Sequence, residues 1–144
     1  MDTKRLTIGT LVGGVVLYAV GYLIFVKAFG SFYAANAGSA TGVDRANELI
    51  WAVALGNFAY AALITYVMGN RVDSTSVVQG ARIGAIVGFL AWCTADFVFY
   101  GSTNIANLTR TIVDPLLEIV HGGIGGAVIA AVLRKMATTG SPPK

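Results

Sequence analysis

Three acids and a histidine interrupt long apolar stretches in the second half of the sequence: Asp96, Asp114, Glu118 and His121. On an α-helix the last three fall on one narrow stripe, because residues three and four positions apart share a face. Carboxyl groups beside a histidine can bind a cation or pass on a proton, and histidine titrates near neutral pH. This stripe is the strongest candidate for chemistry, and Asn57 adds a polar group at mid-depth of another apolar stretch.

Each of these groups also has a structural explanation. Asp114 precedes a proline, which is typical of a helix start with aspartate as the N-cap and proline in the first turn. Asp96 would be equally well explained as an ion-pair partner of Lys27 or Arg110 that locks two helices together. A single histidine is more often a hydrogen-bonded packing residue than a ligand, so both interpretations stay open for His121.

Other chemistries find little support in the sequence. The spacing Glu118-x-x-His121 is used by bundles that bind two metal ions, but those need two such motifs, and this chain has 1 histidine. Zinc-hydrolase, phosphate-loop and dinucleotide motifs are absent from the sequence. We therefore expect no catalytic residue, no bound metal and no cofactor, and an embedded enzyme or metal site ranks third among the interpretations.

The elements that must position these groups are apolar segments. The chain has 144 residues, of which 56% are hydrophobic and 12% are charged, whereas soluble domains carry about 25% charged residues. A membrane-spanning helix needs about 20 mostly apolar residues, and four segments qualify: about 6–29, 48–68, 79–100 and 111–133. The sequence thus predicts an all-α integral membrane bundle of four transmembrane helices, as one domain over 1–136, with a short disordered cytoplasmic tail over 137–144.

The basic residues predict an orientation. With four spans, the side that holds both termini and the middle loop carries most of the 10 basic residues, namely Lys4, Arg5, Arg71, Arg82, Arg134, Lys135 and Lys144. The positive-inside rule places that side in the cytoplasm, and the first span is too long for a cleavable signal. We expect a multi-pass protein of an inner (plasma) membrane with cytoplasmic termini. Because topology explains the excess positive charge, no nucleic-acid partner is expected.

Glycines recur at helical spacing on the last two spans. They are Gly80, Gly84 and Gly88 on the third span and Gly122 and Gly126 on the fourth. In lipid, helices associate through small residues that allow close approach. We expect these glycines to seat helix against helix inside one bundle; the alternative is a seam between the copies of a homo-oligomer.

The first and third spans share a short pattern. The segment Ile8–Gly13 resembles Ile83–Gly88 in its placement of isoleucine, valine and glycine. If this similarity reflects duplication, the bundle consists of two parallel helical-hairpin repeats.

Several short motifs resemble those of small four-helix bacterial integral membrane proteins of unknown function. The motifs are Phe32-Tyr33, Gly80-Ala81 with Gly84, Thr94-Ala95-Asp96, and Asp114 followed by Gly122-Gly123. They touch roughly half of the chain. The resemblance implies the four-helix fold and the membrane location, and it implies no activity.

Two functional interpretations follow from these patterns. In the first, an outward-facing polar and acidic intramembrane site binds or translocates a proton or a small cationic solute, and its residues are Asn57, Asp96, Asp114, Glu118 and His121. In the second, the chain is a non-catalytic accessory or structural subunit of a larger membrane complex, and the acids hold helices together. Both imply the lipid bilayer as a partner, together with a homo-oligomer or a larger membrane complex.

Overall fold

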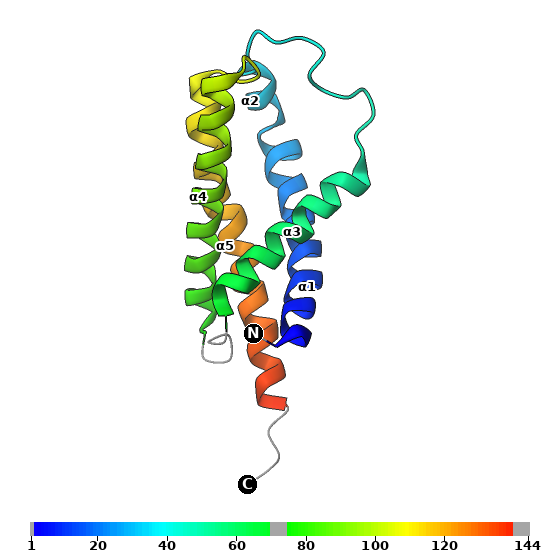
Figure 1. Ribbon diagram of the computed structural model, residues 1–144, viewed down its shortest axis with the longest axis vertical. Coiled ribbons are helices and arrows are strands. Elements are labelled where there is room, and N and C mark those ends of the chain that lie inside the picture. The colour runs from blue at the N-terminus through cyan, green and yellow to red at the C-terminus, as the bar shows by residue number, and fades with distance from the viewer. Residues whose placement is uncertain (1, 70–74, 140–144) are drawn as a thin grey trace.

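The computed structural model describes residues 2–69 and 75–139, and helices dominate this part of the chain. In chain order they are α1 (Thr3–Gly21), η1 (Tyr22–Ala28), α2 (Gly30–Ala35), α3 (Ile50–Met68), α4 (Val77–Ser102) and α5 (Leu108–Thr139). α1 continues directly into η1, a π-helical segment, so the two form one long helix (Figure 1). Within the described ranges, four helices are long and apolar enough to cross a membrane. The predicted all-α, four-helix fold is confirmed, and the chain is a multi-pass membrane protein.

The start of α5 differs from the sequence-based expectation. α5 begins at Leu108 because Asn107 caps it, with the Asn107 Oδ1 atom accepting a hydrogen bond from the Arg110 N–H at 2.9 Å. Asp114 therefore lies inside the helix, with Pro115 beside it. The interpretation of Asp114 as an N-cap is wrong, since a capping residue further upstream starts the helix.

The far end of α5 also extends beyond the predicted span. The helix continues to Thr139, so the prediction of a disordered tail over 137–144 is wrong for residues 137–139. Good helix formers at 134–137 carry the helix past the apolar segment. Residues 140–144 lie outside the described residues.

Two short elements interrupt what the sequence presented as a plain span and a loop. η1 is a π-helical segment, and the Phe29 N–H closes it with a hydrogen bond to the Ile24 carbonyl at 2.9 Å. α2 follows within the segment predicted to be a loop. We refer to the end of the bundle that carries α2, away from the N-terminus, as the α2 end (Figure 1).

The five packing glycines lie between α4 and α5, which make the most extensive helix contact of the fold. A Cβ atom added to Gly84 would run into the Gly122 carbonyl oxygen, and one added to Gly80 would run into the Gly126 carbonyl oxygen. Gly88 approaches the backbone of α5 one turn further along. The close approach that the spacing predicts is therefore made inside one chain.

α3 packs against the bundle along only half of its length. Its buried residues are Ala61, Ile64, Thr65 and Met68, which join the apolar core near the N-terminal end of the bundle. Its first half crosses away from α4 and α5 and leaves Trp51 exposed (Figure 1). The apolar core therefore fills the bundle near its N-terminal end, whereas the first half of α3 stands away from α4 and α5 at the α2 end (Figure 1).

Hydrogen bonds tie the segment directly after α2 to the loop between α4 and α5. The Gly38 N–H donates to the Ile105 carbonyl at 3.1 Å, and Ala37 and Ala106 form an isolated antiparallel bridge. The Asn107 side chain donates to Asn36 Oδ1 at 3.1 Å. These contacts hold α2 beside the start of α5, where the acidic stripe begins.

Candidate functional site

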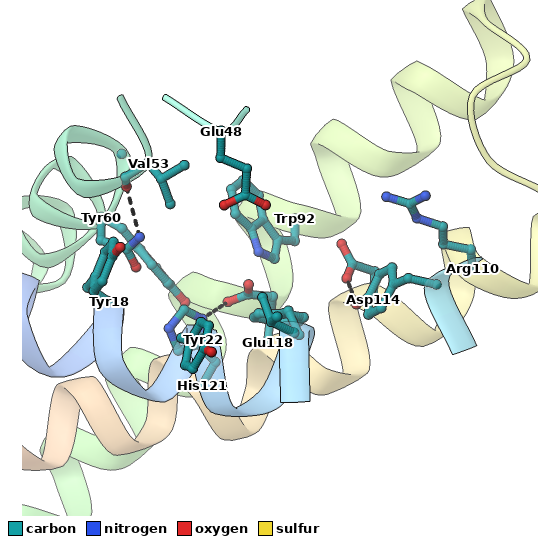
Figure 2. Close-up of a pocket in the computed structure, with 16 residues that line it drawn as sticks. Tyr18, Tyr22, Glu48, Val53, Tyr60, Trp92, Arg110, Asp114, Glu118 and His121 are labelled. Atoms are coloured by element: carbon teal, nitrogen blue, oxygen red, sulfur yellow. Dashed lines mark hydrogen bonds and ion pairs between the residues drawn. The ribbon is translucent and has the colours of Figure 1, made fainter. Parts of the chain in front are cut away.

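A cavity of about 500 Å³ lies at the α2 end between η1, α3, α4 and α5 (Figure 2). Four of the five predicted site residues line it: Asn57, Asp114, Glu118 and His121. Asp96 does not line it. Glu48, two residues before the start of α3, points its carboxyl group into the cavity across from Glu118 (Figure 2).

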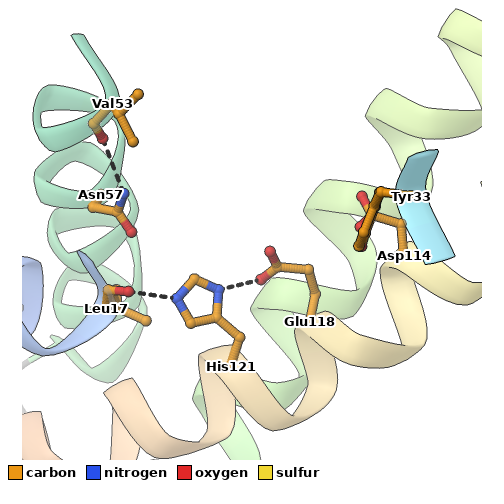
Figure 3. Close-up of polar contacts among 7 residues, drawn as sticks. All are labelled: Leu17, Tyr33, Val53, Asn57, Asp114, Glu118 and His121. Atoms are coloured by element: carbon orange, nitrogen blue, oxygen red, sulfur yellow. Dashed lines mark hydrogen bonds and ion pairs between the residues drawn. The ribbon is translucent and has the colours of Figure 1, made fainter. Parts of the chain in front are cut away.

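Glu118 and His121 form a buried hydrogen-bonded pair on the inner face of α5. Their relative exposures are 1% and 3%, and Nδ1 of His121 lies 2.9 Å from Oε2 of Glu118. The other ring nitrogen, Nε2, lies 2.9 Å from the carbonyl oxygen of Leu17 in α1 (Figure 3). The helical stripe predicted this pairing, while the contact with a backbone carbonyl has no sequence signature.

The two contacts of His121 define where protons must be. A carbonyl oxygen only accepts, so Nε2 carries a hydrogen and donates it to Leu17. A proton must also lie between Nδ1 and Glu118, either on the carboxyl group or on a doubly protonated ring, because two bare acceptors would repel each other. In both arrangements the pair is neutral overall, which is the charge state that burial favours.

Gly21 provides the space through which His121 reaches α1. A Cβ atom at Gly21 would lie 3.2 Å from Nε2 of His121, which is tighter than ordinary side-chain contact. Gly21 is the last residue of α1, directly before η1. The glycine and the π-helical segment together open the surface of the first span to the ring, and π-helical turns are frequent at functional sites.

Asp114 is hydrogen-bonded to a residue of α2. The Tyr33 hydroxyl donates a hydrogen bond to Oδ1 of Asp114, and the Arg110 guanidinium lies 4.9 Å from the Tyr33 ring centre. Burial and the Asp114 carboxyl raise the pKa of the Tyr33 hydroxyl well above its usual range, against the opposing charge of Arg110. Tyr33 is thus a fixed hydrogen-bond donor at neutral pH.

Asp96 lies close to Asp114 and is not among the residues that line the cavity. Its Oδ2 atom is buried and has no hydrogen-bond partner among the described residues. No ion pair joins Asp96 to Lys27 or Arg110 among the described residues. Lys27 instead lies over the Tyr22 ring, 5.2 Å from its centre. The explanation of Asp96 as a helix-locking ion pair is therefore wrong for the described structure.

Asn57 presents one end of its amide to the site. Its Nδ2 group donates to the Val53 carbonyl within α3 at 2.9 Å. Its oxygen points toward His121 and would lie 3.9 Å from a Cβ atom placed at Gly21 (Figure 3). The predicted polar group of the second span therefore faces the Glu118–His121 pair from the opposite wall.

Aromatic rings make up most of the remaining wall, and sequence reasoning gave them little weight. They are Tyr18, Tyr22, Phe25, Tyr33, Tyr60 and Trp92. Tyr60 and Phe25 stand edge-on to the His121 ring, with ring centres 5.7 and 5.4 Å away. The Tyr60 hydroxyl is buried and has no hydrogen-bond partner within residues 2–69 and 75–139, and it would collide with a Cβ atom added to Gly88 or Gly122. Two of the packing glycines thus also admit a tyrosine from α3.

Comparison with known proteins identifies no relative. No family model, no curated protein and no solved structure matches the chain. The resemblance to small bacterial four-helix membrane proteins remains a prediction, and the chemistry of the cavity is the basis for proposing a function.

Proposed function

We propose that the chain binds a small cationic solute in the cavity at the α2 end and exchanges it for a proton held by the Glu118–His121 pair. The charges of the wall support a cation: the carboxyl groups of Glu48 and Asp114 face one basic side chain, that of Arg110, and Glu118 adds a third carboxylate once the pair has released its proton. The Arg110 guanidinium is already engaged with the Tyr33 ring, 4.9 Å from its centre.

The observation that carries this proposal is the buried neutral pair. An ionisable group inside a membrane-spanning bundle is energetically unfavourable unless it is paired. Its presence there therefore favours a functional role. When a monovalent cation enters, the pair can release its proton to water and become negative. The total charge inside the bundle then stays constant, which favours an exchange of one proton for one cation.

The orientation of the cavity follows from the basic residues. We propose that both termini face the cytoplasm of an inner plasma membrane, since most of the 10 lysines and arginines flank that side. The cavity at the α2 end then opens toward the outer side. Reporters fused to the C-terminus test this: a fusion with a cytoplasm-dependent fluorescent protein should be bright, and an active fusion with a periplasm-dependent phosphatase contradicts it.

Proton release on cation binding tests the proposed function. Protein in lipid nanodiscs, in weakly buffered solution near pH 7, is titrated with potassium, tetramethylammonium and tetraphenylphosphonium chlorides while a pH indicator is followed. We expect at least one of these cations to release about one proton per protein. Glu118→Gln should abolish the release, because an amide retains the hydrogen bond to His121 and has no acidic proton.

A matched variant controls for charge alone. Asp44 is an exposed acid of the segment before α3 and does not line the cavity, so Asp44→Asn should leave proton release unchanged. If none of the three cations releases a proton from the folded protein, the proposed function is wrong. If Glu118→Gln lowers the melting temperature and leaves proton release unchanged, the result favours the accessory-subunit interpretation instead.

A further inference from the structure

We propose that the solute is a lipophilic organic monocation with an aromatic or aliphatic body, which enters the cavity from the bilayer along the flanks of α3. This inference rests on the proposed function, and it specifies the substrate class and the route. The size of the cavity, its aromatic wall, the placement of its carboxyl groups and its exposed apolar rim carry the inference.

The volume of the cavity indicates a substrate larger than a proton or a metal ion. At about 500 Å³ it falls within the range of roughly 300–1,000 Å³ that is typical of pockets for drug-sized ligands. Hard metal cations need several oxygen ligands at short range. Within residues 2–69 and 75–139, no three side chains of His, Cys, Asp or Glu lie close enough to hold a metal ion.

The aromatic wall matches the chemistry of an organic cation. Ring faces attract an ammonium or similar centre within about 6 Å, and sites for quaternary ammonium groups are built in this way. The structure already contains two such contacts at the α2 end, because Lys27 lies over the Tyr22 ring and Arg110 over the Tyr33 ring. A substrate cation with a suitable shape can replace the Lys27 contact on Tyr22, since Lys27 is exposed.

The carboxyl groups bracket the cavity from two sides. Glu118 and Asp114 belong to α5, and Glu48 reaches in from the segment before α3 (Figure 2). A single positive charge between these walls meets carboxyl groups in two directions while apolar parts of the solute contact rings. An anion of the same shape meets the same carboxyl groups and is rejected by like-charge repulsion.

The rim of the cavity is apolar and lies at membrane depth. Tyr22, Val53 and Trp92 line the cavity and are nevertheless 46%, 47% and 39% exposed, and each belongs to a membrane-spanning helix. Val53 belongs to the half of α3 that leaves the bundle, whereas Tyr22 belongs to η1 and Trp92 to α4. Lipid chains would contact this rim, so a solute that partitions into the bilayer reaches the cavity sideways.

Equilibrium dialysis in nanodiscs tests the substrate class with three probes. Radiolabelled tetraphenylphosphonium is a lipophilic cation, tetraphenylborate has the same shape with a negative charge, and tetramethylammonium is a cation without an aromatic body. After subtraction of uptake by empty nanodiscs, we expect saturable binding of tetraphenylphosphonium. Tetraphenylborate should fail to displace it, and tetramethylammonium should bind at least tenfold more weakly.

Ring variants test the site. Tyr22→Leu and Trp92→Leu should each weaken tetraphenylphosphonium binding about threefold to tenfold, the loss expected for one cation–π contact. Tyr66→Leu is the matched control, because Tyr66 is a tyrosine of α3 with 68% exposure that does not line the cavity. Its binding constant should equal that of the wild type. An unchanged melting temperature for all three variants establishes that folding is retained.

The outcomes separate this inference from the proposed function. If tetramethylammonium binds as tightly as tetraphenylphosphonium, the cation site stands and the lipophilic class is wrong. If tetraphenylborate competes equally and the ring variants have no effect, the cavity is a non-selective apolar space and the inference falls. If no cation binds in a saturable way, the proposed function itself is overturned.

Discussion

The Nε2 atom of His121 lies 2.9 Å from the carbonyl oxygen of Leu17, a residue 104 positions earlier in the chain. This bond connects α5 to α1 through a backbone atom, and it determines which ring nitrogen carries a hydrogen. Because the tautomer is fixed on one side, Nδ1 is free to share a proton with Glu118. The position of one backbone carbonyl thus determines which nitrogen of His121 faces Glu118 as its hydrogen-bond partner.

Nitrogen NMR can observe this arrangement directly. The chain has 1 histidine, so labelling with ¹⁵N-histidine gives one pair of ring signals. We expect Nε2 to be protonated at neutral pH and Nδ1 to be hydrogen-bonded in the wild type. Glu118→Ala should leave Nε2 protonated and convert Nδ1 into a free acceptor. A wild-type spectrum with a proton on Nδ1 and a bare Nε2 contradicts the assignment.

Gly21→Ala should disturb the same bond. The added methyl group lies 3.2 Å from Nε2, so the ring must move by a few tenths of an ångström, and we expect weakening of its bond to Leu17 to lower stability by about 0.5–1.5 kcal/mol. Gly56→Ala is the control, since Gly56 also lines the cavity and a Cβ atom there meets nothing within 4 Å. We expect Gly56→Ala to be neutral or slightly stabilising in thermal melts, because alanine favours helix. Equal melting temperatures for the two variants contradict this prediction.

Gly84→Ala should weaken the contact between α4 and α5. The added Cβ atom meets the Gly122 carbonyl, which is backbone and cannot rotate away, so overpacking should destabilise the protein by about 1–3 kcal/mol. Gly123→Ala serves as the comparison, because its Cβ atom would lie at an ordinary 3.6 Å from the nearest atom, the Ala81 carbonyl oxygen. Unfolding in detergent should therefore occur earlier only for Gly84→Ala. A loss of the same size in both variants would argue against a specific seam.

Tyr33→Phe should destabilise the α2 end in a pH-dependent way. Loss of the bond to Asp114 should lower stability by about 1–3 kcal/mol at neutral pH. Burial and Asp114 raise the pKa of Tyr33, so the hydroxyl stays protonated in the folded state above about pH 10, where an unfolded tyrosine ionises. The contribution of Tyr33 is thus fully present below about pH 10 and is lost as the pH rises further.

Thermal melts of wild type and Tyr33→Phe across this range provide the measurement. The difference between the two proteins should be constant from neutral pH to about pH 9 and should shrink above about pH 10. A difference that grows at alkaline pH would show that Tyr33 is not a buried donor. Tyr18→Phe is a suitable control, since Tyr18 lines the cavity and its hydroxyl is not engaged with Asp114.

The sequence was sufficient for the features that depend on local periodicity. Apolar length alone predicted a span over about 79–100, which lies within the helix from Val77 to Ser102, and the helical repeat placed Glu118 and His121 on one face. Glycine spacing likewise located the contact of Gly84 with the facing helix. Each of these depends on side chains that lie one or two helical turns apart, which is the range over which a sequence pattern is informative.

Features that depend on distant backbone were beyond the sequence. The carbonyl of Leu17 has no side-chain signature, and Tyr33 becomes a partner of Asp114 only because loop hydrogen bonds hold α2 beside α5. The N-cap interpretation of Asp114 failed for a related reason. A local rule identified one good capping residue, and Asn107, which is equally suited, starts the helix seven residues earlier.

Because α3 is tilted, we expect the thickness of the bilayer to affect the width of the cavity. α3 has 19 residues and α4 has 26, which at 1.5 Å per residue gives lengths of about 28 and 39 Å. A helix of the shorter length barely covers a hydrocarbon core of about 30 Å when upright, and it covers less when tilted. We therefore expect a thicker bilayer to pull α3 upright and toward its neighbours and a thinner one to let it lean outward. The width of the gap beside α3 would then depend both on the chain and on the lipids that surround it.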